Sequence, residues 1–319
     1  MAPEPSGRPL RGVFAASLTP MTDELEPDTA ALVEHVGWLL DEGCDGVAVL
    51  GTTGEANSLS IEQRLRVIEA AGAHLPTDRL MIGTGSTAIA DALRLSRAAL
   101  DAGIFNLLVL PPFYYKPVSD EGLYRFFAGL IDGLGEPRVR VYLYNFPQLT
   151  GLNFSLELIN RLRVDFPEQV VGIKDSSGNW DNMRAVAESF PGFGTFAGTE
   201  RYLLDILRAG GAGCISATAN STSMLCQHVF AAWRDGSPRA DERQEKLTGW
   251  RMALQSVPGI PALKALAAGR TGREGWRNML PPMVPLSADQ ELELMGKLTD
   301  LGFFDNIEAR REPLRAAGE

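Results

Sequence analysis

Val170-Val171-Gly172-Ile173 is a short run without polar side chains, and Lys174-Asp175-Ser176 follows it directly. Such a continuous apolar pattern is typical of a strand covered on both faces, whereas a strand with one wet face alternates apolar and polar residues. Seven other runs are nearly continuously apolar, at residues 13–18, 47–50, 80–82, 107–110, 139–143 and, more weakly, 193–197 and 214–216. We therefore expect eight buried strands.

Between these runs, apolar residues recur with the period of a helix. In residues 28–41, for example, Leu32 and Leu39 share one helical face. Ser60 and Gln63 have the spacing of a capping box that opens the next helix. Eight runs that alternate with helical segments predict an α/β fold, a (β/α)8 TIM barrel, rather than an open doubly wound sheet.

The alternation ends at Asp235-Gly236-Ser237-Pro238. Beyond this break the pattern is helical only, over residues 241–254, 261–268 and 287–301. We therefore expect a barrel in residues 1–236, which carries the active site, and a C-terminal helical appendage in residues 237–319. The charged tail from Asp305 is expected to fray.

Composition excludes several classes of protein. Of the 319 residues 45% are hydrophobic and 22% charged, and the formal charge is −10. An acidic chain lacks the basic face that nucleic acid requires, and no apolar run reaches the roughly 18 residues that span a bilayer. The first seven residues have no apolar core of a signal peptide. Three cysteines without a C-x-x-C pair and three separate histidines predict a cytoplasmic protein with neither disulfide nor metal site.

Lys174 is the most informative candidate for chemistry, because functional residues of such barrels lie at the carboxyl ends of strands. It is one of only five lysines and the only one joined directly to an apolar run. Loss of hydration there favours the neutral amine, a nucleophile that can form a Schiff base. The alternative is a structural ion pair with Asp175 or Glu200.

Three further strand ends carry polar groups. Gly51-Thr52-Thr53-Gly54-Glu55 offers hydroxyls and backbone N–H groups that suit a small carboxylate; alternatively, the threonines satisfy their own loop. Tyr144 ends the fifth run, where its phenol could move protons or could simply cap the barrel. Thr199 and Glu200 follow the seventh run, where they could contact a polar substrate or cap the next helix, and we favour the cap.

Together these segments resemble the dihydrodipicolinate synthase / N-acetylneuraminate lyase family of class I pyruvate aldolases and dehydratases. The matching segments are GTTGE at 51–55, PFYY at 112–115, YNFP at 144–147, GIKDS at 172–176, GCIS at 213–216 and LPPMVPL at 280–286. They occur in the family's order and at similar spacing, so the resemblance covers nearly the whole chain.

The resemblance implies a role for each matched residue. Lys174 would form the imine, and Tyr144 would move protons on the pyruvyl unit. Thr52 and Thr53 would hold the pyruvate carboxylate, with Thr53 also relaying protons. Tyr115 would complete the proton relay of a neighbouring subunit.

The resemblance also implies that the backbone carbonyl of Ile215 faces the Schiff base. The covalent imine on Lys174 would make a metal or an organic cofactor unnecessary. The assembly implied is a homotetramer built from two tight dimers, and the ligand is a small 2-oxo acid.

At three positions the chain differs from branches of the family, and these differences restrict the substrates and the regulation that we expect. Leu149 occupies the position at which dihydrodipicolinate synthases carry an arginine for the carboxylate of the second substrate, and leucine supplies no charge. Ala217 replaces a serine that contacts the sugar chain in the N-acetylneuraminate lyases, and Ile61 replaces a histidine used for feedback by lysine.

We therefore expect a lyase, a Schiff-base aldolase or dehydratase that forms or uses pyruvate and acts on a keto-deoxy or hydroxy 2-oxo acid. The alternative activity is 4-hydroxy-tetrahydrodipicolinate (dihydrodipicolinate) synthase with a different receptor for the second carboxylate. A barrel that only binds a 2-oxo acid is the remaining hypothesis. The joint presence of Lys174, Tyr144, Thr53 and Tyr115 argues against it.

Overall fold

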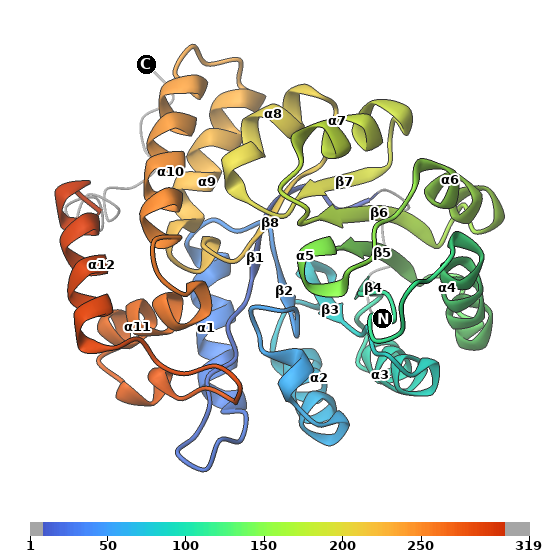
Figure 1. Ribbon diagram of the computed structural model, residues 1–319, viewed down its shortest axis with the longest axis horizontal. Helices are drawn as coiled ribbons and strands as arrows, with labels where there is room; N and C mark the ends of the chain where they lie inside the picture. Colours follow the sequence, from blue (N-terminus) through green and yellow to red (C-terminus); the bar gives the residue numbers. More distant parts are fainter. Residues whose placement is uncertain (1–8, 304–319) are drawn as a thin grey trace.

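The computed structural model of the chain describes residues 9–303. Eight parallel strands close into a barrel, in which each strand pairs with its neighbours in sequence and β8 pairs with β1 (Figure 1). The strands are β1 (Gly12–Ala16), β2 (Gly46–Val49), β3 (Leu80–Gly83), β4 (Asn106–Val109), β5 (Arg140–Asn145), β6 (Val170–Asp175), β7 (Gly194–Ala197) and β8 (Gly213–Ser216). All eight predicted runs form strands, which confirms the predicted TIM barrel.

Helices surround the barrel and alternate with its strands. They are α1 (Thr29–Asp41), α2 (Ile61–His74), α3 (Ile89–Asp101), α4 (Asp120–Leu134), α5 (Pro147–Thr150), α6 (Leu156–Asp165), α7 (Trp180–Ser189), α8 (Leu203–Arg208) and α9 (Ala219–Arg234). The predicted capping box opens α2, since the Ser60 hydroxyl accepts from the N–H of Gln63 and the Gln63 side chain accepts from the N–H of Ser60.

The strands are apolar throughout because each has two buried faces. One face packs beneath the surrounding helices, and the other fills the barrel interior with side chains such as Phe14, Tyr142 and Phe196. Gly172 makes room for one of these rings, since a Cβ at this position would lie 2.5 Å from Cδ1 of Tyr142. The interior of the barrel is therefore filled with side chains.

Three helices of the appendage lie together beside α1 and α9 (Figure 1). They are α10 (Ala240–Leu254), α11 (Gly259–Thr271) and α12 (Ala288–Asp300), as the helical pattern predicts. Trp250 centres their apolar core and donates a hydrogen bond to the carbonyl of Leu301. Leu247 of α10 belongs instead to the core beneath the barrel helices, so the barrel and the appendage share apolar surface. The predicted fraying from Asp305 concerns residues outside the described range.

In residues 9–303 no helix is long and apolar enough to cross a membrane, and no group of three or more His, Cys, Asp or Glu residues is arranged to hold a metal ion. The three cysteines, Cys44, Cys214 and Cys226, are buried free thiols.

A buried histidine joins α1 to the appendage. The side-chain nitrogen of Asn220 donates to the carbonyls of Ala16 and Ala217, so its oxygen accepts from Nε2 of His35 at 2.8 Å. Nδ1 of His35 then accepts from Arg270 of α11 at 3.1 Å. The ring also contacts Trp276. The pKa of His35 is lowered from 6.5 to about 4, mainly by burial; the hydrogen bond to Asn220 opposes this shift, and the charge of Arg270 adds to it.

This histidine makes stability depend on pH in a defined direction. Below pH 6.5 the unfolded chain protonates His35, whereas the folded chain does so only near pH 4. The unfolding free energy should therefore fall by about 2–3 kcal/mol between pH 7.5 and 4.5 from this group. Urea unfolding of the wild type and of His35→Gln at both pH values isolates the effect. An equal pH slope in the two proteins would contradict it.

Candidate active site

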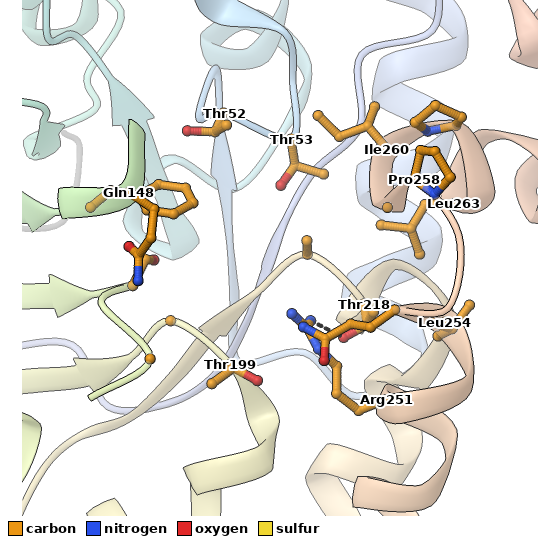
Figure 2. A pocket seen from close by; sticks show the side chains of 18 of the residues that line it. Thr52, Thr53, Gln148, Thr199, Thr218, Arg251, Leu254, Pro258, Ile260 and Leu263 are labelled. Atoms are coloured by element: carbon orange, nitrogen blue, oxygen red, sulfur yellow. Dashed lines mark hydrogen bonds between the residues drawn. The ribbon is translucent and has the colours of Figure 1, made fainter. Parts of the chain in front are cut away.

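The candidate site is a cavity of about 730 Å³ at the carboxyl ends of the strands. The barrel contributes the turn after β2 and the ends of β5 to β8, and the appendage contributes α10, α11 and residues 282–284. Figure 2 shows Thr52 and Thr53 on one side of this cavity, with Arg251 and Thr218 on the other. The active-site cavity is thus built by both predicted parts of the chain, not by residues 1–236 alone.

Lys174 lies on β6 at the floor of the barrel mouth and lines the cavity. Its side chain is almost fully buried, with the residue 3% exposed. Its Nζ donates to the phenol oxygen of Tyr144 at 3.4 Å and lies 4.4 Å from the centroid of that ring. Across residues 9–303 no carboxylate is within ion-pair distance of Lys174.

Asp175 and Glu200, the two acids considered as ion-pair partners of Lys174, bind other groups instead. Asp175 accepts hydrogen bonds from the N–H of Ser177 and from the side chain of Asn182. Glu200 is buried against Arg251. The alternative of a structural ion pair at Lys174 is therefore wrong.

Tyr144 ends β5 and pairs in register with Lys174 on β6. Its phenol oxygen lies 3.1 Å from the hydroxyl of Thr52, so the lysine, the phenol and one threonine form a chain of polar contacts. The relay was expected to pass through Thr53. The structure corrects this expectation, because within its described part the Thr53 hydroxyl makes no hydrogen bond, and the threonine whose side chain reaches Tyr144 is Thr52.

The turn of residues 51–55 leaves donors free. The N–H groups of Gly54 and Glu55 bond to the carbonyls of Gly51 and Thr52 within the turn. The N–H groups of Thr52 and Thr53 make no such bond to any residue between 9 and 303. Both threonines line the cavity, so the turn can present two backbone donors and the Thr53 hydroxyl to a small carboxylate.

This turn is held in an uncommon backbone conformation. Leu50 and Glu55, which flank it, have φ values of 59° and 58°, in the left-handed region that residues other than glycine rarely adopt. Such conformations persist where the surroundings enforce them, and they cluster at functional sites. Here the surroundings include the appendage, because the carboxylate of Glu55 reaches across to it.

Glu55 forms a fully buried ion pair with Lys264 of α11. Its second oxygen accepts from the N–H of Leu280 at 2.7 Å, and Lys264 also donates to the carbonyl of Asn278 at 2.5 Å. Burial lowers the pKa of Lys264, while the charge and hydrogen bond of Glu55 oppose that shift. Lys264 is thus a second buried lysine, and its role is to fasten the appendage over the cavity.

The remaining predicted site residues do not line the cavity of their own chain. Tyr115 is 80% exposed and packs edge-on against Tyr114. Leu149 is 58% exposed on α5, and its neighbour Gln148 lines the cavity instead. Ile215 is fully buried in the interior cluster that also contains Tyr144.

Several cavity residues had no signal in the sequence pattern. Arg251 of α10 and Ile260 and Leu263 of α11 reach the cavity only because the appendage folds over the barrel. At the end of β7, the hydroxyl of Thr199 accepts from the N–H of Arg201, which confirms the predicted cap for Thr199, although this residue also lines the cavity. Glu200 forms no cap and pairs with Arg251 instead.

The fold and the cavity are those of a (β/α)8-barrel enzyme with its chemistry at the carboxyl ends of the strands. The chain belongs to the dihydrodipicolinate synthetase family, whose model matches residues 9–301. This match confirms the family predicted from the sequence and its class of activity: the protein is a lyase.

Three relatives illustrate the range of the family. A DapA-like lyase of Chloroflexus aurantiacus is 36% identical over 248 residues, 77% of this chain and 82% of the relative. A 4-hydroxy-tetrahydrodipicolinate synthase of Acidiphilium cryptum is 35% identical over 70% of this chain and 76% of its own. The putative 2-dehydro-3-deoxy-D-gluconate aldolase YagE of Escherichia coli is 33% identical over 86% of this chain and 91% of its own length. The crystal structure of YagE in complex with pyruvate superposes with a TM-score of 0.84 and 29% identity, and covers 92% of this chain and 99% of YagE.

The buried pair of Glu55 and Lys264 yields a prediction about stability. Lys264→Met leaves a buried carboxylate without its partner, which should cost about 3–5 kcal/mol of unfolding free energy. Adding Glu55→Gln should restore at least half of the loss, because no uncompensated charge then remains. Urea unfolding at pH 7 measures both.

Lys297→Met is the matched control, since Lys297 pairs with Glu293 at an exposed site and should change stability by about 1 kcal/mol at most. If Lys264→Met were no more destabilising than this control, the pair would not hold the appendage.

Proposed function

We propose that this protein is a class I lyase in which Lys174 forms an imine with a 2-oxo acid, and that the reaction forms or uses pyruvate. The observation that carries the proposal is the contrast between its two buried lysines. Lys264 has a carboxylate partner, whereas in the described chain Lys174 has none and faces a phenol and an open cavity. A buried amine without a counter-ion is the form that reacts as a nucleophile.

The proposed reaction uses groups already in contact. The neutral amine of Lys174 adds to the C2 carbonyl of the 2-oxo acid, and loss of water with uptake of one proton gives a protonated imine. This imine accepts an electron pair when C3 loses a proton, or when the C3–C4 bond breaks as the C4 hydroxyl gives up its proton and C4 leaves as an aldehyde. The resulting enamine takes up a proton at C3, and hydrolysis of the imine then returns the amine and the 2-oxo acid. No metal or organic cofactor is needed, because the imine is itself the electron sink.

Proton transfer is proposed to run through Tyr144 and Thr52. The Tyr144 oxygen lies 3.4 Å from Nζ of Lys174 and 3.1 Å from the Thr52 hydroxyl, so it can exchange protons with a group on either side. The free N–H groups of Thr52 and Thr53 would hold the substrate carboxylate and thereby orient the imine. The carbonyl of Ile215 is proposed to face the bound substrate.

The substrate is proposed to be a keto-deoxy or hydroxy 2-oxo acid. A relative that bears the name 2-dehydro-3-deoxy-D-gluconate aldolase supports this choice, and Leu149 supports it too because it offers no charge. Synthesis of 4-hydroxy-tetrahydrodipicolinate is the second candidate, favoured by the name of another relative. We propose that the enzyme acts in the cytoplasm as a homotetramer of two tight dimers.

The first test is covalent trapping of pyruvate. Incubation with pyruvate and borohydride should add one reduced pyruvyl group per chain, located by peptide mapping at Lys174. Lys174→Ala should stay folded and take no label, whereas Lys297→Met, at an exposed site, should still be labelled at Lys174. A label on another lysine, or none at all, would refute the proposal.

Trapping can be followed by a substrate panel of 2-keto-3-deoxy acids, 4-hydroxy-2-oxoglutarate, and pyruvate with aspartate semialdehyde. Because Leu149 supplies no charged contact, we expect dihydrodipicolinate formation to be about 30- to 1,000-fold slower than turnover of the best substrate, as for loss of 2–4 kcal/mol.

The second test concerns Tyr115, whose exposed ring suits an interface with another copy of the chain. We propose that its hydroxyl acts in the neighbouring subunit. Mixing inactive Lys174→Ala with inactive Tyr115→Phe under subunit exchange should then restore activity, because a mixed dimer has one site with neither defect. If Tyr115 acted in its own chain, every site would keep one defect. Absence of recovery, with exchange verified by mass spectrometry, would rule out action in the neighbour.

A further inference from the structure

The charged side chains around the cavity are all basic. Lys174, Arg201 and Arg251 line it, and no acidic residue of the described chain does. This is unexpected in a protein with a formal charge of −10. Lys174 has a proposed role in the imine, whereas the two arginines have none so far.

Arg251 is positioned from β7, β8 and α10 together. Its Nη1 donates to the Thr218 hydroxyl at 2.8 Å and lies 3.3 Å from both the Glu200 carboxylate and the Ser216 hydroxyl. Figure 2 shows the bond to Thr218, on the side of the cavity opposite Thr52 and Thr53. One edge of the guanidinium is thereby fixed, so the group is oriented before any ligand arrives.

The carboxylate of Glu200 has hydrogen-bond donors other than Arg251. The hydroxyls of Ser216, Thr218 and Thr222 also donate to its carboxylate. On the arginine, Nη2 makes no hydrogen bond within residues 9–303, and Nε is buried without a partner. The side chain is 13% exposed, and Arg251 lines the cavity. Nη2 is therefore the guanidinium donor that remains for a ligand in the cavity, since Nε is buried.

The chemistry of the free donor indicates what it binds. Glu200 offsets the charge of Arg251, and the exposed Arg201 is solvated and needs no partner. Nη2 of Arg251 still belongs to a largely buried guanidinium that lines the cavity on the side opposite the 51–55 turn. A carboxylate there would accept a stronger, charge-assisted hydrogen bond than the neutral hydroxyl of a polyol chain.

We propose that Arg251, assisted by the charge of Arg201, binds a second carboxylate at the far end of the substrate. The substrate is then a 2-oxo diacid, an inference that rests on the proposed imine at Lys174. The receptor lies on the appendage side of the cavity and is independent of the position held by Leu149. Arg251 is accordingly the residue that determines specificity for this end of the substrate.

The test compares acids of equal chain length that differ only in their far end. 2-Oxoglutarate is paired with 2-oxopentanoate, and 2-oxoadipate with 2-oxohexanoate. Each is trapped on the enzyme with cyanoborohydride, and intact mass gives the concentration for half-maximal adduct. In the wild type, at least one diacid should need about tenfold less than its monoacid, the effect of one hydrogen bond to a charged group.

Variants then locate the receptor. Arg251→Gln should reduce the diacid preference below about threefold, because the diacid then loses a guanidinium contact that the monoacids do not make. Arg251→Lys should retain part of the preference, because it keeps the charge and loses the planar pair of donors. Arg201→Gln, at an exposed site, should have a smaller effect. Arg184→Gln, an exposed arginine on α7 that does not line the cavity, is the matched control and should have none.

The outcomes separate this inference from the proposed function. If pyruvate is trapped at Lys174 but the wild type shows no diacid preference, the second carboxylate receptor is refuted and the imine stands. A preference that survives in both Arg251→Gln and Arg201→Gln refutes the assignment to these arginines. If Arg251→Gln fails to fold, the diacid preference is measured in Arg251→Lys and Arg201→Gln instead. A preference equal to that of the wild type in both variants overturns the proposal. Failure to trap any 2-oxo acid overturns both claims.

Discussion

The carboxylate of Glu55 holds the turn after β2 and the appendage together, and the cavity depends on this junction. One oxygen pairs with Lys264 of α11, and the other accepts from the N–H of Leu280. A buried carboxylate is tolerated only when its charge and lone pairs are satisfied, so the appendage cannot shift without a large energetic cost. The same contact keeps Glu55 at positive φ, which shapes the turn that presents the N–H groups of Thr52 and Thr53.

Two lysines with equal burial show that burial alone does not identify a reactive amine. Lys264 and Lys174 are both removed from water, but one contacts a carboxylate and the other a phenol. A carboxylate stabilises the ammonium form and leaves the lone pair occupied by a proton. A phenol can exchange a proton with the amine without holding it as an ion. The difference between a structural and a reactive lysine therefore lies in the partner that the neighbouring strand supplies.

Local patterns predicted the barrel and the floor of the site, because each strand and the residue that ends it are adjacent in sequence. Lys174 and Tyr144 were found in this way. The hydroxyl that reaches Tyr144 was assigned to Thr53 instead of Thr52, since the direction of side chains in a turn depends on the strained φ of Leu50 and Glu55. Arg251 could not be found, because α10 reaches the cavity only through packing over residues far away in sequence.

The net charge of the protein and the charged residues in its cavity act on an anionic substrate in opposite directions. A chain with a formal charge of −10 repels an anionic substrate at a distance, although counter-ions screen this effect beyond about 8 Å at physiological salt. Within the cavity the lining side chains that can carry a charge, Lys174, Arg201 and Arg251, are all basic. Low-dielectric walls strengthen such local fields, so an anion gains stabilisation only after it has entered. Discrimination between acids therefore depends on contacts made inside the cavity, where the ends of the substrate meet the 51–55 turn and the guanidinium of Arg251.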